Sequence, residues 1–288
     1  MKHISILCLI LFVGNVVLAQ KQSNAPIRLI VRSDDIGFCY TANEACMEVF
    51  TSGISRSVEI MAPTPWFMEA VKRLKTQPAY DVGVHLVMTS EWENLRWRPL
   101  THAPSLVDSD GYFPQFVWPN KTLPESDYLL KHKVVMAEAE AELRAQIELV
   151  KKHLGNQVTH ISCHMAFNRA NEELAALVNK LAAEYRLPVE LPIQTLPVKD
   201  FSGNQKSPMQ KEQDLIKILK NLGPGTHYLI EHPGYDRGDM KGVGHVGYEN
   251  VSFDREGVTR AFTSAAVKKV IKVRNIELIS IGEVLRGK

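Results

Sequence analysis

Several apolar segments of this 288-residue sequence end in aspartate or histidine. Carboxylate oxygens and imidazole nitrogens are common ligands of divalent metal ions, and the same groups accept and donate protons in catalysis. One such residue would carry little weight, but their recurrence at the ends of four separate segments predicts a shared site. The residues are Asp34, Asp35, His85, His160, His164 and His232.

Asp34 and Asp35 are adjacent at the end of the first apolar segment. Neighbouring residues of a strand point to opposite faces, and two carboxylates at one centre would raise the pKa of one of them. We therefore expect different roles for the two, one binding a metal ion and the other accepting a proton, unless the backbone bends near Gly37. The alternative is a capping or turn pair before the helix expected from residue 42.

His160 and His164 are four residues apart in the sequence VTHISCHM. The flanking β-branched residues favour a strand. Their Cα atoms would then lie roughly 13 Å apart, at about 3.3 Å per residue. Two imidazoles at that distance rarely share one ion unless the chain turns. We expect His164, nearer the strand end, to be the ligand and His160 to lie behind the ligands or in the core, although a ligand role for His160 stays open.

His85 and His232 stand in two further segments. A single histidine such as His85 in an apolar strand is often a core residue. With His164 and one aspartate, however, it completes a set that suits one divalent ion with open positions for water and substrate. His232 precedes Pro233, and a histidine beside a metal site can act as a general acid. The alternative for His232 is a histidine in a turn.

Segments rich in β-branched residues alternate with segments of helical periodicity, which predicts a parallel sheet with helical crossovers. About seven strands in about 260 residues fit an α/β fold with an irregular, TIM-barrel-like (β/α) barrel in a single domain, whose site lies at the carboxyl ends of the strands. A doubly wound open sheet is the alternative. The expected strands are 27–31, 57–61, 81–87, 157–164, 187–191, 226–232 and 276–279. The expected helices are 42–50, 66–74, 128–154, 171–185, 211–222 and 258–273.

Residues 1–19 have the pattern of a secretory signal peptide. Lys2 gives a charged start, an apolar run extends from Ile4 to Val13, and Ala19 precedes the expected cut. The run is short for a membrane span, which needs about 20 residues, although an N-terminal anchor is the alternative. We expect a mature chain of residues 20–288 without a membrane span, exported to the periplasm or the extracellular space.

Charge and cysteine content argue against other classes of protein. The sequence has 34 lysine and arginine residues against 32 aspartate and glutamate residues, a balance that does not favour nucleic-acid binding. No glycine-rich phosphate-binding motif follows the first expected strand, so nucleotide binding has no support. Cys8 lies in the apolar start, and Cys39, Cys46 and Cys163 lack C-x-x-C spacing, which leaves open one disulfide bond or three thiols.

The segment from 89 to about 126 has no regular periodicity and contains three of the four tryptophans in the chain. Aromatic rings stack on the apolar C–H faces of sugars, which makes this segment a candidate substrate loop. The alternative is that the rings pack the segment against the barrel. The three tryptophans are Trp92, Trp97 and Trp118.

The sequence resembles the YdjC-like carbohydrate deacetylases, a family that includes diacetylchitobiose deacetylases. The resemblance covers most of the chain after residue 19 and rests on the order and spacing of short motifs. These are S-D-D-I-G at 33–37, G-V-H-L at 83–86, T-H-I-S-C-H at 159–164 and E-H-P-G at 231–234, with a C-terminal part from Arg255-Glu256 to Ile276–Ile279. The family often has further histidines after its second metal-binding histidine, where this sequence has Met165–Asn168.

The resemblance implies that residues 20–288 form one β/α-barrel domain that binds a single divalent ion, magnesium or zinc. It implies hydrolysis of the N-acetyl group of an amino sugar or oligosaccharide, which would be the partner of the protein; a homodimer is left open. It also implies roles for the residues at the strand ends. These are Asp35, His85 and His164 as metal ligands, Asp34 as the base and His232 as the acid.

Two other functional classes stay open at this point. One is a different metallohydrolase, acting on a phosphoester or on another amide. The other is a sugar-binding protein without turnover.

Overall fold

The computed structural model describes residues 25–121, 123, 127–189, 191, 193–199, 201, 203 and 205–287. The expected signal peptide and Cys8 lie outside these residues. None of the helices that the structure describes is both long enough and apolar enough to span a bilayer. Cys39, Cys46 and Cys163 are free thiols.

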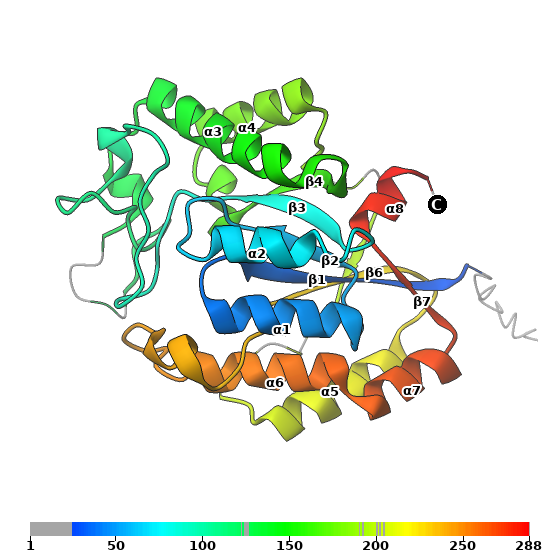
Figure 1. Cartoon of the computed structure of the whole chain (residues 1–288). Helices are drawn as coiled ribbons and strands as arrows, with labels where there is room; N and C mark the ends of the chain where they lie inside the picture. The colour runs from blue at the N-terminus through cyan, green and yellow to red at the C-terminus, as the bar shows by residue number, and fades with distance from the viewer. Residues whose placement is uncertain are drawn as a thin grey trace, which may run out of the picture.

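A parallel sheet with helical connections forms the molecule, as the alternation of segments predicts (Figure 1). Its strands are β1 (Ile27–Ile36), β2 (Ser57–Ile60), β3 (Asp81–Leu86), β4 (Val158–Cys163), β5 (Leu196–Pro197), β6 (Gly225–Glu231) and β7 (Ile276–Ile279). The α-helices are α1 (Tyr40–Thr51), α2 (Phe67–Leu74), α3 (Met136–Leu154), α4 (Glu172–Tyr185), α5 (Pro208–Asn221), α6 (Val251–Thr263), α7 (Ala265–Val273) and α8 (Ile281–Leu285).

The strand order is β4-β3-β2-β1-β6-β5, and β7 pairs with the first residues of β1. All these pairings are parallel. Helices α3 and α4 lie at one end of the sheet, α1 and α2 along its middle, and α5 to α7 at the other end (Figure 1). No pairing joins β4 to β5 in the part of the chain that the structure describes, so the barrel is irregular and open at this seam.

Strand β1 lies at the centre of the sheet and is covered on both faces. Leu29 and Val31 belong to the apolar cluster that includes residues of α5, α6 and α7. Ile30 points the other way and packs against Ile281 and Val284 of α8. Burial on both faces explains the apolar run Leu29–Val31 in this strand, as is usual for parallel sheets.

Farther along the strands, the inner face of the sheet becomes polar. Arg32 of β1, Glu59 of β2 and His160 of β4 are close to one another on this face. Gly83 of β3 faces the same layer, and a Cβ atom there would overlap the side chains of Glu59 and His160. The absence of a side chain at residue 83 therefore lets these two groups meet.

One expected strand, at 187–191, is wrong. None of its described residues is in a strand, although the Ile161 N–H donates a hydrogen bond of 3.0 Å to the Pro188 carbonyl. Proline has no N–H to return to a ladder, so the contact with β4 does not extend. The short strand β5 at Leu196–Pro197 pairs with β6 instead.

Two expected helices differ in extent. Helix α3 begins at Met136, since residues 129–131 form a separate 3₁₀ turn. The expected helix 258–273 is two helices, because the Ser264 side chain accepts hydrogen bonds from the N–H groups of Ala266 and Val267 and so starts α7. A serine cap of this kind satisfies the free N–H groups of a new helix start.

Candidate active site

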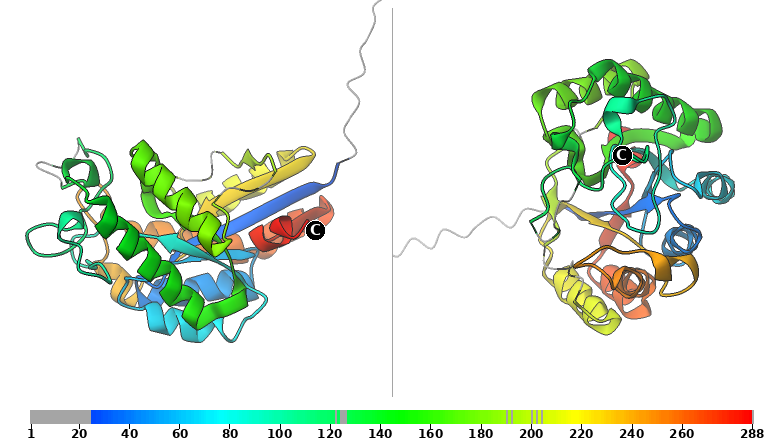
Figure 2. Two further views of the ribbon diagram at one scale, coloured as in Figure 1. Left: turned by 90° about the horizontal axis from the view of Figure 1, so that it is seen from above. Right: turned by 90° about the vertical axis from the view of Figure 1, so that its left-hand side faces the viewer.

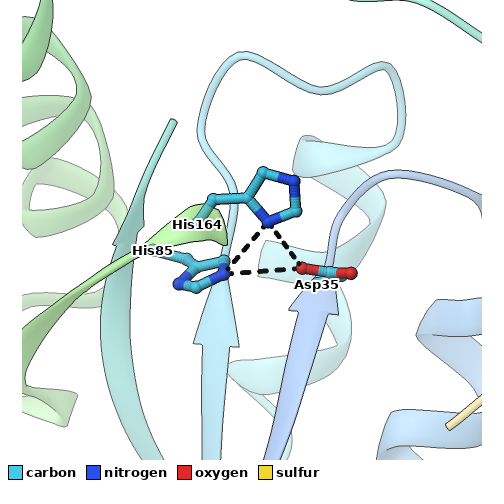
Figure 3. A group of neighbouring side chains, drawn as sticks. All are labelled: Asp35, His85 and His164. Carbon is cyan, nitrogen blue, oxygen red and sulfur yellow. Dashed lines mark hydrogen bonds and ion pairs between the residues drawn. The ribbon is translucent and has the colours of Figure 1, made fainter. Parts of the chain in front are cut away.

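Three buried side chains converge at the carboxyl ends of β1, β3 and β4 (Figure 3). Asp35 lies near the end of β1, His85 in β3, and His164 directly after β4. The Asp35 Oδ1 atom lies 3.2 Å from His164 Nδ1 and 3.5 Å from His85 Nε2, and the two nitrogens are 3.3 Å apart. The chain thus brings these three residues together as the sequence predicts.

The three ligand atoms fit a divalent cation. They lie within 4.8 Å of one another. The Oδ1 atom of Asp35 is buried and has no hydrogen-bond partner among the described residues. A buried carboxylate oxygen without a donor is unfavourable, so this geometry calls for a positive group. One oxygen and two imidazole nitrogens also leave positions open for water and substrate.

The backbone at Asp35 explains how two adjacent aspartates reach one centre. Asp35 has φ 69°, in the left-handed region that residues with a side chain rarely adopt, and Gly37 has φ 114°. The turn brings Asp34 Oδ2 to 3.9 Å from His85 Nε2, so both carboxylates lie beside this histidine. The bend expected near Gly37 therefore begins at Asp35 itself, at a cost of order 1–3 kcal/mol.

Arg32 fixes the orientation of Asp34. Its Nε and Nη2 atoms donate hydrogen bonds of 2.6 Å each to the two carboxylate oxygens of Asp34. Burial alone would lower the pKa of Arg32, but Asp34 and Glu59 raise it above its ordinary value. A bidentate arginine–carboxylate pair holds one geometry, so Asp34 is kept at the edge of the centre.

His164 has a second buried carboxylate partner, Glu91. Its Nε2 atom lies 3.0 Å from Glu91 Oε2, on the opposite side of the ring from Asp35. Burial would lower the pKa of His164, yet Glu91 and Asp35 raise it to about 10. With its one N–H directed at Glu91, a neutral His164 presents the Nδ1 lone pair to the centre.

A hydrogen-bond chain fixes His85 in the same way. The Ser162 hydroxyl donates its hydrogen to Glu59. The same hydroxyl oxygen lies 2.6 Å from His85 Nδ1 and therefore accepts a hydrogen bond from that N–H. The Nε2 lone pair of His85 therefore faces the centre.

His160 lies at the far end of this chain, with its Nε2 atom 2.5 Å from Glu59 Oε1. Burial would raise the pKa of Glu59 and lower that of His160. Their mutual attraction instead lowers the pKa of Glu59 and raises that of His160. The structure places His160 outside the converging group.

His232 and Arg255 both contact the outer oxygen of Asp35. His232 Nε2 lies 3.7 Å from Oδ2, and its side chain is 41% exposed, which places it between the centre and solvent. Arg255 of α6 donates a hydrogen bond of 3.1 Å to the same oxygen. Burial would raise the pKa of Asp35, but His232 and His164 hold it well below its ordinary value. Asp35 is therefore an anion with Oδ1 directed at the two histidines.

The model of the YdjC-like protein family matches residues 28–273 of this chain. The chain belongs to the YdjC-like family. It is 27% identical to a carbohydrate deacetylase of Brevibacillus brevis, over 89% of this chain and 99% of that protein. It is 32% identical to a carbohydrate deacetylase of Thermus thermophilus, over 71% of this chain and 76% of that protein.

A solved structure has the same fold as this YdjC-like protein. It is a protein of Enterococcus faecalis named “putative cellobiose-phosphate cleavage protein”, with a TM-score of 0.70 and 24% sequence identity. The match covers 90% of this chain and 99% of that chain. The irregular barrel is therefore a fold shared with a solved structure over nearly the whole described chain.

The tryptophans of the loop at 89–126 have two different environments in this YdjC-like protein. Trp92 and Trp97 are buried. Trp97 donates a hydrogen bond of 2.9 Å to the Thr89 carbonyl, and the Trp92 ring packs against the Arg255 guanidinium and stacks with the His245 ring. These two rings pack the loop onto the site, whereas Trp118 is 43% exposed. Stacking of a sugar on any of them stays a prediction.

Five polar residues of the site were missed by reasoning from the sequence. Arg32 and Ser162 had a signal, because each stands two residues before a predicted site residue and so shares its strand face. Glu59 is the one charged residue in its strand. Glu91 comes from a loop and Arg255 from helix α6, and no local periodicity directs either side chain to the site.

Proposed function

We propose that this YdjC-like protein is a metal-dependent carbohydrate deacetylase that hydrolyses the N-acetyl group of an amino sugar or oligosaccharide. The observation that carries the proposal is that the buried side chains of Asp35, His85 and His164 converge, while Oδ1 of Asp35 has no hydrogen-bond donor among the described residues. Membership of the family, and relatives named carbohydrate deacetylases, support the substrate class. A bound magnesium or zinc ion would polarise the acetyl carbonyl and lower the pKa of a coordinated water.

Asp34 is the proposed general base. Its carboxylate is held by Arg32 and lies 3.9 Å from His85 Nε2, beside the atoms that would hold the ion. Each carboxylate oxygen can accept more than one hydrogen bond, so the pair with Arg32 leaves room for a water molecule. Asp34 accepts the proton of this water as its oxygen attacks the acetyl carbon.

His232 is the proposed general acid. It lies on the solvent side of Asp35, on the opposite oxygen from the two ligand histidines. A protonated imidazole at this position donates its proton to the sugar nitrogen as the C–N bond breaks. The products are acetate and a free amino sugar.

Acetate release with and without a chelator tests this proposal. Suitable substrates are N-acetylglucosamine, diacetylchitobiose and longer chitooligosaccharides. We expect chelation to abolish acetate release and added zinc or magnesium to restore it. His85→Ala and His164→Ala should each lose bound metal, whereas the exposed His102→Ala should keep it and serve as the matched control.

Two results would contradict the proposal. Acetate release that is unchanged by chelation and by both histidine substitutions would rule out the metal. Phosphate release from a phosphorylated sugar, without acetate release from any acetylated sugar, would replace the deacetylase by another metallohydrolase.

Export of the protein is a second proposal, supported by the pattern of residues 1–19. N-terminal sequencing of exported protein should give a chain that begins just after Ala19. Recovery of the intact Met1 terminus in the membrane fraction would instead indicate an anchored protein.

A further inference from the structure

A pocket with a volume of about 340 Å³ contains none of the residues assigned above to the reaction. Its lining combines two aromatic rings with charged and hydroxyl side chains. These are Tyr40, Thr41, Glu44, Trp66, Arg237 and Asp239.

The walls of this pocket are the chain segments that leave the active site. Tyr40 stands five residues after Asp35, and Arg237 stands five residues after His232. Five residues of extended chain span at most about 17 Å, which bounds the distance from the centre to each wall. Figure 2, right, looks onto the end of the molecule where both segments leave the sheet. The pocket therefore lies on the side of the sheet where the strands have their carboxyl ends, with Tyr40 within about 17 Å of Asp35 and Arg237 within about 17 Å of His232.

The aromatic pair is exposed, yet its backbone is firmly held. Tyr40 and Trp66 are 37% and 40% exposed, with ring centroids 5.3 Å apart and planes at 61°. The Trp66 N–H donates a hydrogen bond of 2.9 Å to the Gly37 carbonyl, and Asn43 donates one of 3.2 Å to the Trp66 carbonyl. Gly37 is two residues from Asp35, so the same turn that aims Asp35 at the centre also positions Trp66.

Charged groups surround the two rings. Arg237, whose side chain is 61% exposed, donates a hydrogen bond of 3.0 Å to Glu44. Asp239 accepts hydrogen bonds from the N–H groups of Tyr40 and Thr41 and so fixes this wall against the start of α1. A guanidinium can donate to sugar hydroxyls and a carboxylate can accept from them.

A sugar ring matches this combination of groups. One of its faces presents C–H groups, which stack on aromatic rings, and its rim carries hydroxyls, which pair with charged side chains. The chemistry of the pocket thus agrees with the substrate class proposed for the neighbouring centre.

We propose that this pocket is a distal subsite that binds one sugar residue of an oligosaccharide whose N-acetyl group lies at the Asp35–His85–His164 centre. The inference rests on the proposed function and adds where a further sugar residue of an oligosaccharide substrate would bind. Trp66 provides the main stacking surface beside Tyr40, whose ring has the Arg73 guanidinium 5.1 Å from its centroid, and Arg237 and Glu44 contact the hydroxyls.

Kinetics on substrates of different length test the subsite. The measurement is kcat/KM for acetate release from N-acetylglucosamine and from penta-N-acetylchitopentaose. Trp66→Ala and Tyr40→Ala should each lower the ratio of the pentasaccharide value to the monosaccharide value by about 2- to 12-fold, the range expected for one lost aromatic stack. Trp66→Phe should retain most of this ratio because it keeps a ring. The exposed Met68→Ala, on the same helix but outside the pocket, is the matched control.

The possible outcomes separate the subsite from the proposed function. If the wild type deacetylates both substrates and neither alanine variant changes the length ratio, the subsite is refuted while the deacetylase remains. If the wild type releases no acetate from any sugar, the proposed function fails, and calorimetric binding of the pentasaccharide that is weakened by Trp66→Ala would still support the subsite. A change of oligomeric state in Trp66→Ala with an unchanged length ratio would make the pocket a contact between copies and overturn the proposal.

Discussion

Glu91→Gln should weaken metal binding although Glu91 is not itself one of the proposed ligands. Glu91 accepts the Nε2–H of His164 at 3.0 Å and is itself buried. The contact sets which nitrogen of His164 faces the centre and makes that nitrogen a stronger donor to a cation. Glutamine keeps an acceptor oxygen at nearly the same place but removes the negative charge. The variant therefore isolates the electrostatic part of the contact.

The size of the effect follows from two opposing changes. Loss of such a partner typically lowers metal affinity about 10- to 100-fold, and the retained acceptor places glutamine near the lower limit, at about tenfold or 1.4 kcal/mol. In the metal-free protein, however, Glu91 and Asp35 raise the pKa of His164 to about 10 despite its burial, so a proton competes with the metal at neutral pH. Removal of the Glu91 charge lowers that pKa and weakens the competition. With a pKa of about 10, His164 of the wild type is still mostly protonated at pH 9, so the tenfold loss should be reduced at pH 9 and reduced further at pH 7.

Zinc affinity measured by competition with a chelating dye, at pH 7 and at pH 9, checks this prediction. Affinity of the wild type should rise between these two pH values, and affinity of Glu91→Gln should rise less. Glu93→Gln is the matched control. Glu93 stands two residues after Glu91, its side chain is exposed and accepts a hydrogen bond from the Val246 N–H, and the substitution removes the same charge. Equal affinities and equal pH slopes for wild type and Glu91→Gln would refute the argument that this contact tunes His164.

Two further predictions concern the carboxylates of the polar layer. Asp35→Asn should lose bound metal, whereas Asp34→Asn should keep it and lower kcat about 10²- to 10⁴-fold; metal analysis beside kinetics decides, and the reverse pattern would exchange the two roles. His160→Gln should lower the free energy of unfolding by about 3 kcal/mol at pH 5.5, because it breaks a buried pair with Glu59. Folding raises the pKa of His160 from 6.5 and lowers that of Glu59 from 4.5. Between pH 4.5 and pH 6.5 the pair therefore makes its full contribution to the free energy of unfolding. This contribution is lost as the pH rises through the folded pKa of His160 or falls through the folded pKa of Glu59. Denaturant unfolding should therefore show a smaller difference at pH 10, and a difference that does not depend on pH would contradict the pairing.

Much of the site could be predicted because the ends of parallel strands meet at one edge. The alternation of strands and helices predicts that the strands leading to Asp35, His85 and His164 are parallel. The carboxyl ends of β1, β3 and β4 therefore bring these three residues together. Strand geometry also separated His164 from His160, since a four-residue step along β4 carries His160 away from the centre to Glu59. The expected meeting of these segments needed only the strand period and the parallel order, whereas the choice of Asp35 over Asp34 as the ligand came from the family resemblance.

The remaining parts depend on contacts that no local pattern contains. Glu91 is 73 residues from His164, and Arg255 is 220 residues from Asp35. Glu91 stands in a loop, and Arg255 lies in the first part of α6, before the helix expected at 258–273. The left-handed backbone of Asp35 was also hidden, because an aspartate at the end of a strand ordinarily continues the extended chain. Long-range packing decides all three features.

The charges around the centre show why these missed residues matter. Four buried carboxylates face the layer, those of Asp34, Asp35, Glu59 and Glu91, and the guanidiniums of the mostly buried Arg32 and the buried Arg255 oppose them. Two negative charges remain, and a net buried charge is costly. Without a metal ion, Glu59 and the buried Asp81 raise the pKa of His160, and Glu91 and Asp35 raise that of His164. His160 stays paired with Glu59, so a divalent cation must displace the proton of His164. Residues that look purely structural, such as Glu91 and Glu59, thus create the negative field that favours a cation at the proposed catalytic centre.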